Sequence, residues 1–165
     1  SPEIPVSDLA TILDRIVGPG LALLHAKMDS AQARVMLLAI GLQESRFKHR
    51  RQIGGPARGF WQFERAGGVQ GVLRHPATRA LATDVCRLRS VEANATDVYE
   101  RLEHDDLLAC AFARLLLWSD PQPLPELGYA AKAWALYLRT WRPGKPHRDS
   151  WDALYRQAQA AVEAR

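Results

Sequence analysis

The sequence predicts a mainly α-helical protein that forms a single domain over residues 1–165. Apolar residues recur at helical spacing along most of the chain, and no segment shows the sustained two-residue alternation that strands require. Two runs, near residues 35–42 and 107–118, are apolar around the whole helix circumference, which is typical of buried helices. A chain of this length can bury such a core without disulfides.

The first segment is predicted as two helices separated by a break. Ser7 is placed to cap a helix that ends near Val17, because the glycines and proline of residues 18–20 disfavour its continuation. A second helix is expected from Leu21 toward Met28. The acidic, proline-containing start lacks the basic and apolar regions of a secretory signal, so no signal peptide is expected.

A third helix, for which Asp29 and Ser30 both offer an N-cap, is predicted to end near Glu44. Apolar residues surround this helix, so we expect it to form a buried central pillar. Glycine, proline and aromatic residues break the helical pattern at about 50–66, where we expect a small irregular lobe or a short hairpin. No apolar run approaches the ~20 residues of a transmembrane helix, so no transmembrane segment is expected.

The rest of the chain is predicted as helices joined by short breaks. Asp105 and Asp106 supply negative charge at the start of a second buried helix, which should pack against the first. Prolines make residues 120–125 an extended connection. Asp149 is expected to cap a final amphipathic helix that ends near residue 164. The other predicted helices cover residues 67–74, 77–90 and 126–142.

The formal charge of +4 indicates a surface that favours anionic partners. Residues 48–51 form the densest basic cluster, for which nucleic acid, lipid head groups and acidic wall polymers all qualify, as does a solvated loop. No recognition helix with clustered basic side chains is evident, so nucleic acid is not an expected partner. The two cysteines form no C-x-x-C pair and the five histidines lack ligand spacing, so neither a metal nor another cofactor is expected.

Glu44 is the residue whose position most strongly suggests chemistry. It falls in the last turn of a buried helix, where the helix dipole disfavours an anion, and burial beside Phe60 and Trp61 would act in the same direction. Both effects raise a carboxyl pKa, and glycosidic cleavage needs an acid that is protonated near neutral pH. The alternative is a glutamate that points into water.

The aromatic segment 59–64 supplies candidate contacts for a sugar. Gly59 permits close approach of the backbone, and Gln62 offers a donor and an acceptor to a sugar or its N-acetyl group. The rings of Phe60 and Trp61 are candidates for the same site, and the alternative is that they belong to the core. A carboxylate at the end of a buried helix, followed by this segment, suggests a sugar-cleaving site.

The Glu-Ser pair at 44–45, followed by Gly-Phe-Trp-Gln at 59–62, resembles the soluble lytic transglycosylase and goose-type lysozyme branch of the lysozyme-like superfamily. The resemblance extends loosely over about 31–142. It implies a lysozyme-like fold and cleavage of the bond between N-acetylmuramic acid and N-acetylglucosamine in peptidoglycan. It maps the catalytic acid to Glu44 and a cleft residue to Gln62.

The sequence departs from the family pattern at three points. Arg46 follows the pair where a small residue is usual, Phe-Trp replaces Leu-Met at 60–61, and the later Ala-Tyr-Asn-Ala-Gly segment has no clean counterpart. The resemblance implies a tyrosine that supports the catalytic carboxylate. Tyr137 is our choice for this role, and Trp134 and Tyr129 are the alternatives.

A lytic transglycosylase needs one carboxylate, so the resemblance implies that Glu44 acts first as acid and then as base while a 1,6-anhydro ring closes. A hydrolytic lysozyme would normally need a second carboxylate. Glu64 is the only acid nearby, so it is the candidate for that second carboxylate. The alternatives are that it faces solvent or pairs with Arg58. Ser45 has no adjacent base that would make it a nucleophile, and we group it with the substrate-binding residues.

The segment 129–146 has a less specific resemblance to bacteriophage and prophage lysozyme-like proteins. This implies a protein that acts on the peptidoglycan glycan strand at the bacterial cell wall, from the phage virion or the host cytoplasm, with other virion proteins as further partners. The alternative is a non-catalytic lysozyme-like module, a virion structural or glycan-binding part. In that alternative Arg46 pairs with Glu44 and lowers its pKa.

Overall fold

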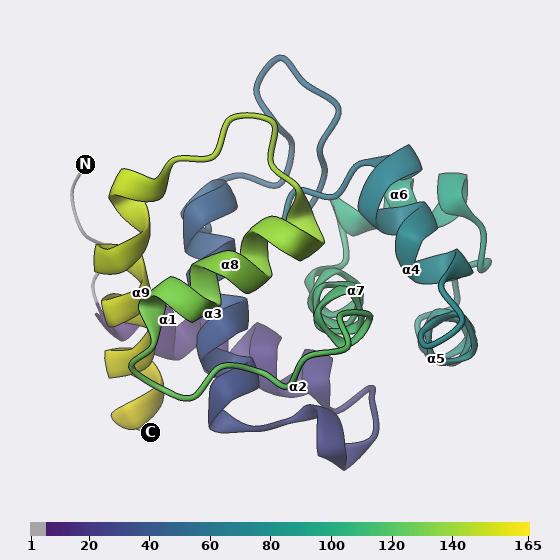
Figure 1. Cartoon of the computed structure of the whole chain (residues 1–165). Coiled ribbons are helices and arrows are strands. Elements are labelled where there is room, and N and C mark those ends of the chain that lie inside the picture. The colour runs from purple at the N-terminus through teal and green to yellow at the C-terminus, as the bar shows by residue number, and fades with distance from the viewer. Residues whose placement is uncertain (1–5) are drawn as a thin grey trace.

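The computed structural model describes residues 6–165, with side chains from residue 8 onward, and Figure 1 shows that helices dominate it. No named strand occurs in this part of the chain, so the mainly α prediction is confirmed. The α-helices are α1 (Val6–Ile12), α2 (Gly18–Leu21), α3 (Ala31–Ser45), α4 (Gln70–Arg74), α5 (Arg79–Leu88), α6 (Ala95–Leu102), α7 (Asp106–Trp118), α8 (Ala130–Trp141) and α9 (Arg148–Glu163). The other helical turns are η1 (Leu13–Val17), η2 (Ala26–Met28) and η3 (Arg65–Val69).

The two predicted buried helices, α3 and α7, lie in the middle of the fold (Figure 1). Each begins with a side-chain cap: Ser30 accepts a hydrogen bond from the backbone N–H of Ala33 at 3.0 Å, and Asp105 accepts one from Leu108 at 3.0 Å. The two helices contact each other as expected, but α3 packs most extensively against α9, and α7 packs against α2. The C-terminal helix is therefore the main packing partner of the central one.

The predicted helix break at residues 18–20 is wrong, because α1, η1 and α2 follow one another without interruption as far as Leu21. The turn before Pro19 is widened into a π-helix, a geometry that relieves the clash between a proline ring and the preceding carbonyls. A Cβ on Gly20 would lie 2.7 Å from the Cβ of Cys110, so the glycine allows α2 to approach α7 closely.

The predicted helix from 21 to 28 is also wrong. After α2 the chain makes a turn and only the short η2 forms, where the His25 side chain accepts a hydrogen bond from Lys27 N–H at 3.1 Å. The predicted cap at Ser7 lies outside the described side chains. Within residues 6–165, no helix is both long and apolar enough to cross a membrane.

Three differences occur in the second half of the chain. The helix α6 was not predicted, although Asn94 caps it by accepting from Asp97 N–H at 2.9 Å. The helix α8 begins at Ala130 rather than at 126, because a turn precedes it. Asp149 is not the cap of α9: it lies in the first turn after the N-cap residue His147, where its charge still complements the helix dipole.

The segment between α3 and η3, where the sequence predicts a small irregular lobe or a hairpin, contains no helix. Two isolated antiparallel bridges pair Arg58 with Arg51 and with Phe63. Figure 1 shows this segment projecting as a loop beyond the C-terminal end of α3. The chain then returns to the body, which brings residues 60–63 against α3 and α8.

Candidate functional site

The predicted acid lies at the end of α3 and meets a tyrosine of α8. Glu44 is in the last turn of α3, which ends when Arg46 adopts the left-handed conformation with φ 57°. The hydroxyl of Tyr137 donates a hydrogen bond to Oε2 of Glu44. Among the three aromatic candidates for a supporting residue, the structure brings Tyr137 to the carboxylate.

Burial governs the protonation of this pair. Desolvation raises the pKa of Glu44 from its usual 4.5 to about 7, against the opposing effect of the hydrogen bond from Tyr137, which favours the carboxylate. The pKa of Tyr137 is raised as well, by burial and by the adjacent Glu44. The tyrosine therefore stays a hydrogen-bond donor at every pH at which Glu44 titrates.

Tyr137 is held in a cluster of indole rings from α8 and α9. Its ring stacks on Trp151 with centroids 5.4 Å apart and an interplanar angle of 9°. Trp134 and Trp141 lie 5.4 and 6.2 Å from it. Such contacts fix the ring, so the hydroxyl is directed at Glu44 by packing. Trp151 was not predicted as part of this site, because a single tryptophan on an amphipathic helix carries no signal that distinguishes it from core.

Three side chains tie the aromatic segment to the helices on either side. The indole N–H of Trp141 on α8 donates to the carbonyl of Trp61 at 2.9 Å. The indole of Trp61 donates to the carbonyl of Leu37 on α3, also at 2.9 Å. The hydroxyl of Ser45, the residue after Glu44, donates to the carbonyl of Phe60 at 2.7 Å. The backbone around Glu44 is thereby fixed from two sides.

The expectation that Phe60 and Trp61 bind substrate with their rings is corrected by their burial. Their side chains are 4% and 1% exposed, and both pack edge-on against Phe47, at 5.4 and 5.6 Å between centroids. The alternative holds: these rings belong to the core. Ser45 is 1% exposed, so it is a structural hydrogen-bond donor rather than a residue that reaches a ligand.

Position 59 requires a glycine because of packing within the protein and not because of a ligand. Its φ is +79°, and an added Cβ would lie 3.1 Å from the carbonyl oxygen of Leu102 in α6. The close approach that the sequence suggested is therefore made by the protein itself. Gln62 is half-buried with φ 54°, and its side-chain amide donates to the carbonyl of Gly59 at 2.9 Å, which leaves its own oxygen as the group for an external donor.

Gln62 and Trp141 also line a groove of about 630 Å³. The groove runs between the end of α8, the turn η3 and the connection after α7, and it includes Glu64 and Arg142 in its walls. Phe63 packs edge-on against Trp141 at 5.8 Å, so the aromatic segment supports this wall. A groove with an indole edge, an amide and ionic side chains has the mixed surface that polar ligands require.

The remaining charged candidates are resolved by their contacts. Glu64 is exposed, and the predicted alternative partner Arg58 instead forms an ion pair with Glu103 at 3.5 Å. Arg46 does not form an ion pair with Glu44: its guanidinium donates to the backbone carbonyls of α3, including that of Gln43 at 3.3 Å. The proposed silencing contact is therefore absent from the described residues.

The described residues contain no group of three or more histidine, cysteine, aspartate or glutamate side chains that could hold a metal ion. At Glu44 the structure places a single, largely buried acid with one hydroxyl donor beside it. No family model, curated protein or solved structure matches the chain.

Proposed function

We propose that this chain is a peptidoglycan-cleaving muramidase, with lytic transglycosylase as the favoured reaction and Glu44 as the general acid and base. The observation that carries the proposal is a glutamate at the end of a buried helix, titrating at about 7 and hydrogen-bonded by Tyr137. At pH 7 about half of such groups hold a proton, which suits a residue that must give a proton and then take one.

In this reaction Glu44 gives its proton to the oxygen that joins N-acetylmuramic acid to N-acetylglucosamine, and the bond to the muramoyl C1 breaks. The resulting carboxylate then accepts the proton of the muramoyl 6-hydroxyl as that oxygen bonds to C1, which closes the 1,6-anhydro ring. The hydroxyl of Tyr137 fixes the carboxyl and stabilises the anion that forms after proton transfer. No cofactor is needed.

The groove lined by Gln62 does not include Glu44 or Tyr137 in its walls, and we assign it to the part of the glycan strand beyond the bond that is cleaved. The side-chain oxygen of Gln62 is the acceptor for an N-acetyl N–H, and the edge of Trp141 provides an apolar contact for a sugar face. The protein would act at the bacterial cell wall as a phage or prophage product, in the virion or from the host cytoplasm, with other virion proteins as further partners.

A hydrolytic outcome would require Glu64, the exposed acid in the same groove, to activate water. The non-catalytic alternative depended on an ion pair between Arg46 and Glu44, and Arg46 is instead occupied by carbonyls of α3. Without that ion pair, burial is the dominant effect on Glu44, so its acid form is available near neutral pH. This favours the enzyme over the non-catalytic module.

The test is digestion of purified peptidoglycan followed by mass spectrometry of the released muropeptides. Wild-type protein should release anhydro-muropeptides, which lack one water relative to hydrolysed ends. Glu44→Gln should abolish release while its circular dichroism spectrum stays that of the wild type, and Glu64→Gln should leave release unchanged. Wild-type protein that releases nothing across a range of pH and salt would overturn the proposal, and hydrolysed ends lost in Glu64→Gln would replace transglycosylation by hydrolysis.

A further inference from the structure

We propose that the projecting loop 51–58 docks on an anionic lipid surface, with Ile53 entering the boundary between head groups and acyl chains. The proposal does not depend on the reaction at Glu44. It rests on three features of the described residues: a braced loop, a bare apolar side chain at its tip, and a group of cations at its base. These cations belong to the basic cluster at residues 48–51, for which the sequence left several partners open.

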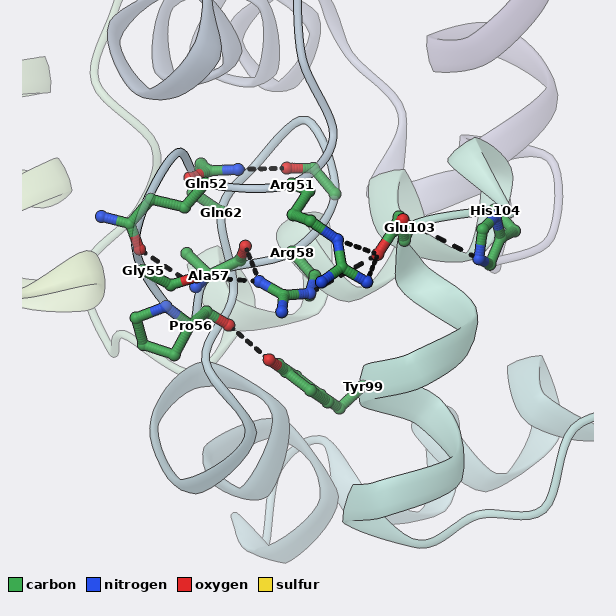
Figure 2. A network of polar contacts seen from close by, with 11 residues as sticks. Arg51, Gln52, Gly55, Pro56, Ala57, Arg58, Gln62, Tyr99, Glu103 and His104 are labelled. Atoms are coloured by element: carbon green, nitrogen blue, oxygen red, sulfur yellow. Dashed lines mark hydrogen bonds and ion pairs between the residues drawn. The ribbon is translucent and has the colours of Figure 1, made fainter.

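The loop is braced by Arg58, which lies between the loop residues and Glu103 in Figure 2. The guanidinium of Arg58 donates to the carbonyls of Gly55 and Ala57 at 3.0 and 2.9 Å. Its Nε lies 3.5 Å from the carboxylate of Glu103, which also forms an ion pair with Arg51 at 3.0 Å. One carboxylate, from the residue that follows α6, therefore holds both sides of the loop.

The tip is closed by contacts of its own. Gln52 and Ala57 are joined by two hydrogen bonds, one between their backbones at 3.0 Å and one from Ala57 N–H to the Gln52 side chain at 3.1 Å. The hydroxyl of Tyr99 donates to the carbonyl of Pro56 at 2.6 Å (Figure 2). A loop fixed in this way loses little conformational entropy on docking.

Ile53 lies in the turn of this braced loop and is almost fully exposed. Its side chain is 89% exposed, which is the highest value for a large apolar residue among the described side chains. Beside it, Gly54 has φ +70° and open space around it, so the turn presents Ile53 without covering it. The transfer of such an exposed isoleucine side chain from water into an apolar medium is favourable.

The base of the loop carries three cations, Lys48, Arg50 and Arg51, which we call the basic collar. Arg50 forms a bidentate ion pair with Asp106 at 2.8 Å, yet 45% of its side chain is exposed, and Arg51 remains 63% exposed beside Glu103. No ion pair involves Lys48 in the described part of the chain. Together with Arg58, the loop brings four cations to two carboxylates, so its base is positive.

These features favour a lipid surface over the other anionic partners. Acidic wall polymers are polar and offer nothing to Ile53. Single-stranded nucleic acids bind through aromatic rings on which bases stack, and the exposed tip has none. A specific protein interface buries about 1,000 Å² or more, and a narrow tip with one apolar side chain supplies far less. A bilayer boundary accepts one inserted side chain together with a few cations, whose contributions add.

The test is cosedimentation with vesicles of equal parts phosphatidylglycerol and phosphatidylcholine at an ionic strength of about 0.15 M. Ile53→Ser should lower the partition coefficient about fivefold to tenfold, because the isoleucine no longer enters the boundary. Lys48→Gln should lower it about fivefold. Leu88→Ser is the matched control: Leu88 is 60% exposed on α5, away from the loop, so partition should be unchanged.

Insertion is measured separately with a polarity-sensitive label on Ile53→Cys. The natural cysteines, Cys86 and Cys110, are buried and burial raises the pKa of Cys86 to about 11, so the label reacts at the loop. A blue shift with the anionic vesicles supports docking. Partition that is equal for Ile53→Ser and wild type, or a label that stays in water, would overturn it, as would binding to duplex DNA that depends on Lys48 and exceeds binding to the vesicles.

Discussion

Replacement of Glu44 by glutamine should stabilise the protein, and the gain should grow with pH. The carboxyl is buried at a position where its ionised form is poorly solvated, so its pKa lies at about 7 in the folded chain against 4.5 when solvated. The folded state therefore holds the proton over a pH range in which the unfolded chain releases it. Glutamine keeps the shape and an acceptor for Tyr137 but has no charge to desolvate.

The difference between the two pKa values of Glu44 fixes the sign and the size of the effect on stability. A raised folded-state pKa means that the contribution of Glu44 to stability is fully present below 4.5 and is lost as the pH rises through about 7. A difference of this size corresponds to about 3 kcal/mol at most. The free energy of unfolding of the variant, relative to that of the wild type, should therefore rise by about 2–3 kcal/mol between mild acid and a pH above neutral.

Urea unfolding followed by tryptophan fluorescence, repeated from about pH 4 to about pH 8.5, measures this directly. Glu64→Gln is the control, since it makes the same substitution at an exposed position. If the free energies of unfolding of Glu44→Gln and wild type differ by the same amount at every pH, Glu44 is not desolvated in the folded chain and does not hold a proton near neutral pH.

Two other changes test the surroundings of Glu44. Tyr137→Phe removes the hydrogen bond that favours the carboxylate, so the pKa of Glu44 should rise further. The alkaline limit of any acid-dependent activity should then move to higher pH. NMR titration of Glu44 measures the shift, and an unchanged or lower pKa would contradict the prediction. Gly59→Ala should cost more stability than Gly54→Ala in thermal unfolding, because both add a side chain at positive φ but only the first meets the carbonyl of Leu102; equal losses would refute the steric argument.

The parts of the fold that the sequence predicted well have strong local signals. Ser30 lies directly before a long apolar run and caps it as expected, and Asp105, which the sequence places as negative charge at the start of the second run, also caps its helix. The missed helix α6 is only two turns long, so its apolar periodicity is too short to stand out, and Asn94 was its one signal. The continuation through residues 18–20 depends on a widened turn and on close packing with Cys110, which no local pattern encodes.

In the candidate site, too, the features with a local signal could be predicted, and the features that depend on contacts between distant segments could not. The position of Glu44 in the last turn of a buried helix is a local property, and it could be predicted. Its contact with Tyr137 joins α3 to α8, and it was expected only because of a family resemblance. Whether Phe60 and Trp61 face a ligand or the core depends on which side of the returning chain packs on α3, and an aromatic residue suits either place equally.

The hydrogen bonds around the aromatic segment place unequal demands on the positions they join. The donors are side-chain groups, so the residue type matters at Trp141, Trp61 and Ser45. The acceptors are main-chain carbonyls, which any amino acid supplies. Residues at 37 and 60 can therefore vary in type, within the limits of core volume, while the framework persists. Proteins that share this framework would be recognised by where their donors lie in space, even after the residues that accept from them have diverged.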